Sequence, residues 1–261
     1  MCLILLSYSN HPSYRLILAA NRDEFYDRPT AQLDFWDEAP HVLAGRDLKS
    51  GGTWLGITKA GRICAITNFR DPAVQISDAP SRGLLVADFL KGTESPQIYL
   101  QKVKEAGERY NGFNLLAGDE SGIFCCSNRS DNIISISPGV HGLSNHLLDT
   151  PWPKIAKGKK RFEKILSSDE INTEEIFELL SDRNMPPDRD LPDTGVGIEW
   201  ERILSPLFIN SDIYGTRSSS IVLIGKNNIT FMERTYIKDG SNSMKHETRK
   251  ITLPNDFQLI K

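Results

Sequence analysis

A cysteine directly follows the initiator methionine, and a residue at this position can serve as a catalytic nucleophile. Methionine before a small residue is generally removed, which would leave Cys2 with a free α-amino group. An α-amine has an unperturbed pKa of about 7.7–8.0, so it could accept the proton of its own side chain. One residue would then supply both the nucleophile and the base of a hydrolase. In the alternative interpretation, Cys2 is a small apolar residue that begins a buried strand.

Four consecutive polar residues follow the second apolar run of the chain: Asn21, Arg22, Asp23 and Glu24. If residues 2–8 and 14–20 pair as an antiparallel hairpin, this cluster lies at the sheet end that holds Cys2. A cation such as Arg22 could lower the pKa of the thiol, and one of the two carboxylates could accept from the α-ammonium group. The alternative is a solvated loop with a surface ion pair, which contributes little stability.

Three further stretches carry side chains suited to binding. In the stretch SGGTWLG, glycines allow close approach of the backbone to a ligand, and Trp54 could form a pocket wall, although glycines in a tight turn explain the same letters. Asn68 ends the next apolar run, and Asn145 lies in a Gly/Ser/Asn turn between His141 and His146. An amide N–H in such a place can stabilise an oxyanion, although loop asparagines usually bond to local backbone.

The elements that must position these residues alternate in blocks along the chain. Short apolar runs predict strands in residues 2–68, 113–136 and 218–253, with hairpin turns between them. Two helical blocks are predicted between them, the first within residues 81–110 and the second at 154–167 and 173–181, where Asn172 is the cap. Strands, helices, strands, helices and strands without a repeat favour an α+β fold with two mainly antiparallel sheets between helical layers.

One domain spanning residues 1–261 is the simplest organisation, because the Pro- and Gly-rich loop at 183–200 is the only candidate boundary. The charge is nearly balanced, with 31 Lys and Arg against 34 Asp and Glu, so no general attraction for nucleic acid is expected. No apolar run approaches the roughly 18 residues of a transmembrane segment. The four cysteines show neither a disulfide framework nor a metal-ligand spacing, which favours a reducing, cytoplasmic location.

The blocks AANRDEFYDRPT, SGGTWLGI, AITNFRDP, GLSNHLLDTPWPK and YGTRSSSIVLI, together with the Met-Cys start, closely resemble the NRDE family, also called the transport and Golgi organisation family. The matching blocks run from residue 1 to about residue 225. This family is similar to N-terminal-nucleophile hydrolases, and the resemblance therefore implies a four-layer αββα sandwich. It is most similar there to the bile-salt hydrolase and penicillin acylase branch, which cleaves amides with an unmasked cysteine.

By this resemblance Cys2 is the nucleophile, Asn145 matches an oxyanion asparagine, and Asn68 matches a second polar group near the site. That branch has an Arg and an Asp three residues apart after the second strand, whereas here that spacing falls on Asn21 and Glu24. Strand alternation lets only one of Asn21 and Arg22 face the site.

Two functional hypotheses follow. In the first, the protein is an amidohydrolase or esterase for a small acylated substrate, needing no cofactor, with Trp54 and Trp152 lining an acyl pocket and Arg217 binding a carboxylate. In the second, which the family resemblance suggests, the same pocket carries haem or an acyl lipid such as acyl-CoA without cleaving it. A scaffold in secretion is a third possibility, for which no residue pattern speaks.

Overall fold

Two adjacent strands at the start of the chain form the hairpin from which the fold is built. The structure is a computed structural model that describes residues 3–238 and 244–255. In it β1 (Leu3–Tyr8) pairs antiparallel with β2 (Tyr14–Phe25), as predicted. We predicted that the polar cluster 21–24 follows this strand. In the structure the cluster belongs to β2 itself. Its side chains find buried partners on other elements, so polar residues extend the strand rather than end it.

The first sheet is fully antiparallel and has the strand order β10-β1-β2-β11-β12-β13. Besides the hairpin it contains four strands: β10 (Gly139–Leu143), β11 (Tyr214–Gly225), β12 (Asn228–Lys238) and β13 (Met244–Pro254). The three C-terminal strands were predicted, whereas β10 was not. The segment of β10 is rich in glycine and shows little alternation of apolar residues. It is a strand because it pairs with β1.

The second sheet is also antiparallel, and its strands follow one another in chain order from β3 to β9. Its strands are β3 (Thr30–Trp36), β4 (Ala39–Asp47), β5 (Leu55–Thr58), β6 (Ile63–Asn68), β7 (Phe113–Asp119), β8 (Gly122–Ser127) and β9 (Ile133–Ser135). The sequence did not predict β3 and β4, because two irregularities in their register break the regular alternation.

Five α-helices are found in the described residues: α1 (Gly83–Lys91), α2 (Pro96–Glu105), α3 (Pro153–Leu166), α4 (Thr173–Leu180) and α5 (Ile198–Leu204). The first four were predicted, and Asn172 caps α4 through the N–H of Glu174 as expected. The segment 183–200 is not wholly a loop, since it contains a 3-10 turn at Asp188–Asp190 and the start of α5.

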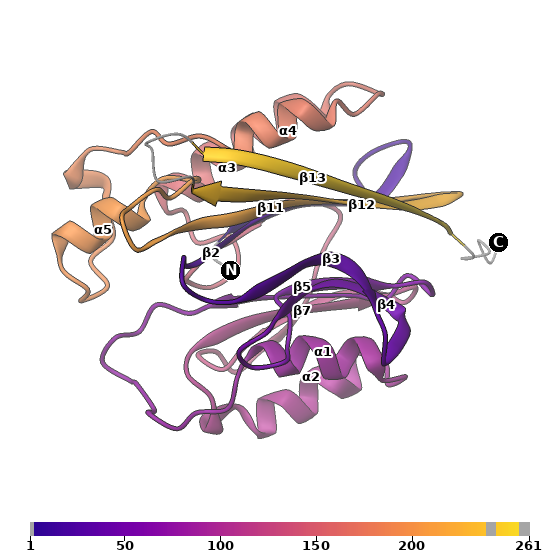
Figure 1. The fold of residues 1–261 in the computed structure, drawn as a ribbon, viewed down its shortest axis with the longest axis horizontal. Coiled ribbons are helices and arrows are strands. Elements are labelled where there is room, and N and C mark those ends of the chain that lie inside the picture. Colours follow the sequence, from indigo (N-terminus) through magenta and orange to yellow (C-terminus); the bar gives the residue numbers. More distant parts are fainter. Residues whose placement is uncertain (1–2, 239–243, 256–261) are drawn as a thin grey trace.

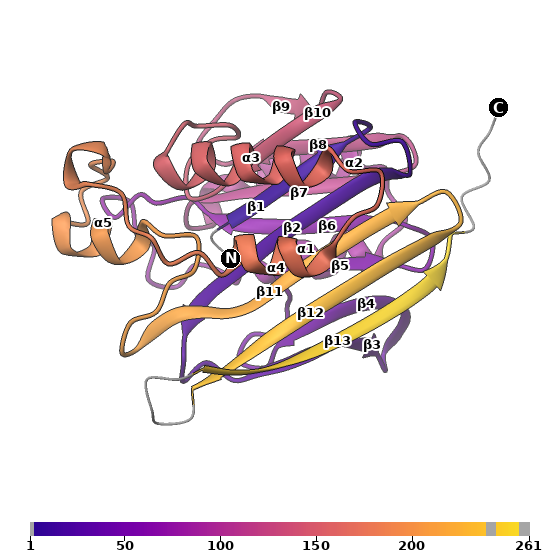
Figure 2. The same ribbon diagram turned by 90° about the horizontal axis from the view of Figure 1, so that it is seen from above.

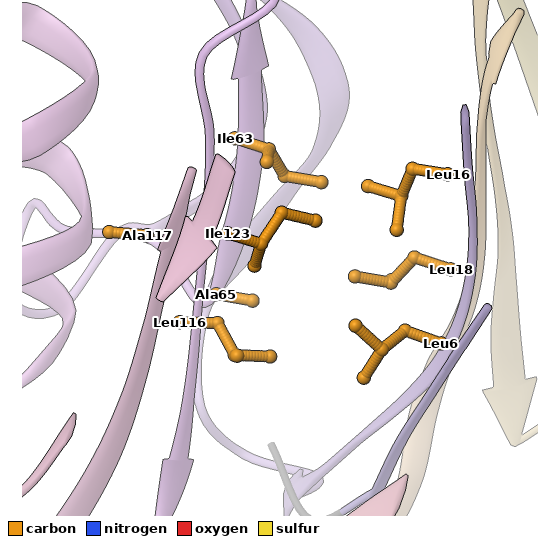
Figure 3. Close-up of a pocket in the computed structure, with 8 residues that line it drawn as sticks. All are labelled: Leu6, Leu16, Leu18, Ile63, Ala65, Leu116, Ala117 and Ile123. Atoms are coloured by element: carbon orange, nitrogen blue, oxygen red, sulfur yellow. The ribbon is translucent and has the colours of Figure 1, made fainter. Parts of the chain in front are cut away.

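The elements stack in four layers, with α3 and α4 on the first sheet and α1 and α2 on the second (Figures 1 and 2). Strand alternation divides the apolar side chains among the three interfaces: Leu5 packs toward α3 and α4, whereas Leu6 packs between the sheets. Figure 3 shows the inter-sheet interface, where Leu6, Leu16 and Leu18 point across to the second sheet. The predicted αββα sandwich is therefore confirmed.

Candidate active site

Three strands bring polar residues to the end of the sandwich where β1 begins. Leu3 pairs with Asn21 on one side, and Ile4 pairs with Leu143 on the other. Because both neighbours run antiparallel to β1, the cluster 21–24 and the turn that follows Leu143 lie at this end. Cys2 itself lies outside the described residues. The residues predicted to surround it thus come from the two strands that flank the start of β1.

Asn21 is fully buried and faces the helical layer. Its Nδ2 donates to the carbonyl oxygens of Leu180 and Leu207, both at 2.8 Å, and its Oδ1 accepts from Ser219 Oγ at 2.6 Å. These bonds use both N–H groups of the amide and one acceptor position. Asn21 therefore joins β2 to α4 and to the segment before β11, and does not face the space between the sheets.

Arg22 takes the opposite face of β2 and lies between the two sheets. Its guanidinium stacks on the Trp54 ring, with 4.2 Å from Cζ to the ring centroid, and the residue is 4% exposed. Nη1 has no hydrogen-bond partner. Burial lowers the pKa of Arg22, although arginine keeps its proton at neutral pH. Of the two residues left open by the sequence, Arg22 faces the inter-sheet side.

A cavity of about 440 Å³ opens beside Arg22. Its volume is in the range of small-molecule sites. The lining comes from β2, the β4–β5 connection, the end of β6 and the segment that leads into α1: Arg22, Asp23, Glu24, Phe25, Arg28, Asp47, Ser50, Thr53, Trp54, Ile66, Asn68, Ala79, Pro80, Ser81, Arg82, Gly83, Asn111 and Tyr214. Asp23, Glu24, Trp54 and Asn68 are thus brought together with Arg22.

The acidic residues of the cavity wall have partners. Asp47 accepts from Arg28 at 2.6 and 3.0 Å, and Glu24 lies 3.8 Å from the same guanidinium. Asp23 accepts from Thr216 Oγ1 at 2.6 Å. Burial acts to raise the pKa of Asp47, but its hydrogen bonds from Arg28 and from nearby backbone N–H groups hold it below the usual value. Arg28 and Asp47 were not predicted as site residues, because nothing in their spacing indicates that they meet.

Glycines make room for the Trp54 side chain and for the wall beside it. A Cβ on Gly45 would lie 2.5 Å from Trp54 Cη2, so only glycine allows the indole its place under Arg22. Gly52 lies against the backbone of Gly83, where a side chain would overlap the start of α1. Gly52 therefore serves a close contact between two backbone segments of the wall, a role that we did not predict, whereas Gly51 has a positive φ of +73°, which fits the predicted tight turn.

Asn145 lies at the same end of the sandwich, in a polar network. Its Nδ2 donates to the carbonyl oxygen of Asn68 at 3.0 Å, and its Oδ1 accepts from Arg70 at 3.3 Å. Arg70 in turn forms a buried ion pair of 2.5 Å with Glu201 on α5. The network joins the two asparagines predicted as oxyanion donors, and it attaches α5 to this end of the molecule.

Four of the predicted residues that the structure describes lie outside the cavity lining: Asn21, Asn145, Trp152 and Arg217. Trp152 packs against Arg70 and His146, with 5.1 Å from the Arg70 Cζ to the ring centroid. Arg217 donates to the carbonyl oxygens of Phe25 and Arg28 at 2.8 and 3.1 Å. Trp54 and Trp152 thus do not line one common pocket, and Arg217 binds backbone rather than facing the cavity.

Comparison with known proteins identifies the family of the chain. A family profile described as Transport and Golgi organisation 2 matches residues 1–238. The chain belongs to this family. The mouse Transport and Golgi organization 2 homolog is 37% identical over 275 residues, which cover 97% of this chain and 99% of the relative. The Drosophila melanogaster Transport and Golgi organization protein 2 is 30% identical over 291 residues, 99% of either chain. The resemblance predicted from the sequence blocks is confirmed.

The chain also resembles solved structures at low identity. A Caenorhabditis elegans N-acylethanolamine-hydrolyzing acid amidase ortholog matches with a TM-score of 0.49 and 10% identity, over 85% of this chain and 92% of that one. A C2A variant of the conjugated bile acid hydrolase from Clostridium perfringens matches with a TM-score of 0.48 and 11% identity, over 96% of each chain.

The other three cysteines of this family member are buried. Cys125 and Cys126 lie on opposite faces of β8, one between the sheets and one toward α1 and α2. Burial raises the pKa of Cys126 to about 12 and raises those of Cys64 and Cys125 further. Inert thiols of this kind do not act as nucleophiles at neutral pH.

Residues 3–238 and 244–255 contain neither a metal-binding cluster nor a helix suited to span a membrane. No group of three or more His, Cys, Asp or Glu residues there is arranged to hold a metal ion. Both ring nitrogens of His141 are engaged, by Asp149 at 2.7 Å and by the Ser137 carbonyl at 3.0 Å. No helix of the described chain is long and apolar enough to cross a membrane.

Proposed function

We propose that this protein is a hydrolase for amides or esters of a small acylated substrate, with Cys2 as its N-terminal nucleophile. The observation that carries the proposal is the strand register at the start of β1, where Leu3 lies opposite Asn21 and Ile4 lies opposite Leu143. The residue before Leu3 in the sequence is Cys2. Polar groups from both flanking strands and a cavity of about 440 Å³ lie at this end of the sandwich.

The proposed reaction has two halves. After removal of Met1, the α-amine takes the proton of the Cys2 thiol, and Sγ attacks the acyl carbonyl carbon. The amine then gives this proton to the leaving nitrogen or oxygen as its bond to the acyl carbon breaks. Water attacks the resulting thioester, which releases the acid and restores the thiol. Each half passes through a tetrahedral oxyanion that needs hydrogen-bond donors.

Asn145 is the best candidate for such a donor. One of its two Nδ2 hydrogens is used by the Asn68 carbonyl, so a second N–H is available to an oxyanion. The bond to Asn68 and the contact with Arg70 fix the amide in place, which a preorganised donor requires. Asn68 itself lines the cavity.

The burial of the three other thiols supports Cys2 as the nucleophile. Cys64, Cys125 and Cys126 are all buried with raised pKa values, and none lines the cavity. A cysteine hydrolase built on this chain would therefore use Cys2.

The test is turnover of short N-acyl amides and acyl esters by the wild-type protein and by Cys2→Ala. We expect the variant to lose activity by up to about 10⁶-fold, the loss found when a hydrolase loses its nucleophile. Cys64→Ala is the matched control and should keep its activity. Mass spectrometry should show Met1 absent from the active protein. Turnover by Cys2→Ala equal to wild type, or Met1 retained in an active preparation, would contradict the mechanism.

The alternative function is a carrier that holds haem or an acyl lipid in the same cavity without cleavage. Among the lining residues in the described chain there is no histidine, cysteine or methionine, so Tyr214 is the only candidate there for an iron ligand. A carrier would bind its ligand equally well with and without Cys2 and would show no turnover with any member of the substrate panel. A hydrolase would show turnover that depends on Cys2.

A further inference from the structure

Arg22 is a cation of the cavity wall for which no ion pair is found among the described residues. None of the ion pairs found among the described residues includes it, and its Nη1 lacks a hydrogen-bond partner while the residue is 4% exposed. A buried charge without a partner is costly, and proteins usually pair it or place it where a ligand will do so. The stack on Trp54 holds the guanidinium plane but satisfies none of its N–H groups.

From this we infer that the cavity is an oxyanion-binding site, in which Arg22 holds a carboxylate or phosphate group of the ligand. A guanidinium offers a planar fork of donors that matches both groups. The inference extends the proposed function by naming the substrate class, an acylated molecule with an anionic group, and in that respect it rests on the proposed function. The binding of an anion by Arg22 does not depend on the proposed hydrolase activity.

The start of α1 forms the wall of the cavity near Arg22. Ser81, Arg82 and Gly83 line the cavity, and the first turn of α1 carries neither an acidic residue nor a side-chain cap. By contrast, Ser95 caps α2 and Asn172 caps α4. The N–H groups of Leu84 and Leu85 already donate to the carbonyl oxygens of Ser81 and Arg82, at 3.2 and 3.1 Å, so the contribution of this helix start is the positive end of its dipole, which favours an anion. It adds to the attraction of Arg22.

The acidic residues of the wall do not cancel this preference. Asp47 and Glu24 are oriented by Arg28, and Asp23 accepts from Thr216. Glu233 is buried nearby, its Oε1 accepts from the Leu33 N–H at 2.8 Å, and burial raises the pKa of its carboxyl, which favours the neutral form. The charges of Glu24, Asp47 and Glu233 act on Arg22 from a distance, but none of these carboxylates forms an ion pair or a hydrogen bond with it among the described residues, which leaves its N–H groups to a ligand.

The position of the site relative to the proposed nucleophile restricts the substrate further. Arg22 is one residue from Asn21, which pairs with Leu3 at the start of β1. An anionic group held by Arg22 would thus lie a short distance from the scissile bond, on the leaving group or early in the acyl part. A substrate with its charge at the far end of a long acyl chain does not fit this arrangement.

The test uses inorganic phosphate and acetate as probes, each titrated against chloride at constant ionic strength. Melting temperature and tryptophan fluorescence report binding, because Arg22 stacks on Trp54. We expect one or both anions to raise the melting temperature and change the fluorescence of the wild-type protein. The stronger of the two shows whether a phosphate or a carboxylate is preferred. Arg22→Gln should weaken binding by roughly tenfold or more.

Arg46→Gln is the matched control, since Arg46 stacks on Trp36 at 4.1 Å and does not line the cavity. It should bind as the wild type does. If circular dichroism shows that Arg22→Gln does not fold, Arg22→Lys replaces it and should also bind the anions more weakly. In addition, Trp54→Phe should lose the fluorescence change that the anions cause in the wild type. Equal binding by wild type and the Arg22 variants, or no response of the wild type beyond chloride, overturns the inference.

The same titration in Cys2→Ala separates the two proposals. Anion binding that survives in a variant without turnover supports the site and the nucleophile together. Turnover that depends on Cys2, in a protein that binds neither anion, overturns the anion site and leaves the hydrolase intact. Anion binding without turnover in the wild type supports the site and contradicts the hydrolase.

Discussion

Two regions of the inter-sheet space share their strands and differ in their side chains. At the first, Leu16 and Leu18 of β2 face Ile63 and Ala65 of β6, and the space left among the apolar residues is about 10 Å³ (Figure 3). At the second, farther along the same two strands, Arg22 and Asn68 line a cavity of about 440 Å³. We call these regions the apolar half and the polar half.

The comparison shows that one pair of strands can support a closed core and an open site. In the apolar half, side chains fill the space to the density of a protein interior. In the polar half, stability comes from ion pairs and hydrogen bonds between elements, such as Arg70 with Glu201 and Asn145 with Asn68. Substitutions in the two halves should therefore fail for different reasons.

The largest effect is expected at the ion pair that holds α5 onto the polar half. Glu201→Gln leaves the buried Arg70 without a counter-charge and should lower the free energy of unfolding by about 3–5 kcal/mol. The neighbouring Arg202→Gln, whose partners are on the surface, should have a far smaller effect because exposed ion pairs contribute little stability. Urea denaturation of both variants measures the difference, and equal losses would show that the pair does not hold this half.

A similar or slightly smaller effect is expected in the apolar half. Leu18→Ala removes a side chain from the closed part of the interface and should lower the free energy of unfolding by about 2–5 kcal/mol. Ser81→Ala, in the wall of the polar half, should change it by no more than about 0.5 kcal/mol. If Ser81→Ala were as costly as Leu18→Ala, the two halves would not differ as described.

A smaller effect is expected where glycine makes room for the wall of the cavity. Gly45→Ala places a methyl group against the Trp54 ring and should cost about 1–3 kcal/mol, with weaker anion binding because the ring moves from under Arg22. Trp54→Phe shortens the ring at this contact. A double-mutant cycle should therefore show that Gly45→Ala is less costly in the Trp54→Phe background; strict additivity would mean that this contact does not limit the ring.

The smallest effect is a pH dependence of the polar half. The pKa of Asp47 is held below its unfolded value of 3.8, so its bond to Arg28 contributes stability above that pH and is lost as the pH falls through the folded pKa. The free energy of unfolding of the wild type should fall below about pH 4. The free energy of unfolding of Asp47→Asn should fall less steeply over the same pH range. If the variant and the wild type fell with the same slope, the bond between Asp47 and Arg28 would not contribute to the pH dependence.

Local rules predicted much of the fold. The hairpin of β1 and β2 follows from two apolar runs around a turn, and the helices α2 and α4 follow from their caps at Ser95 and Asn172. Elements whose partners are distant were missed. The strands β3 and β4 have irregular alternation, and α5 is short and is attached through the ion pair of Glu201 rather than through an apolar face.

The sequence predicted which strand ends meet at the candidate site, but neither all of the residues that line the cavity nor the orientation of their side chains. Asn21, Arg22, Asp23 and Glu24 do lie at the end of the sandwich where β1 begins, but the sequence could not show that Asn21 bonds to carbonyls nearly 160 and 190 residues away, at Leu180 and Leu207. Nor could it show that Trp152 packs away from the cavity. Such contacts depend on the tertiary arrangement, and no local pattern encodes them.

The bonds of Asn21 couple the outer layer of the molecule to its interior. The last turn of α4 is attached through Leu180 to a side chain on one face of β2, and the next residue presents its guanidinium on the other face. A single peptide unit therefore separates the side chain that fastens α4 to the sheet from the guanidinium that lines the cavity.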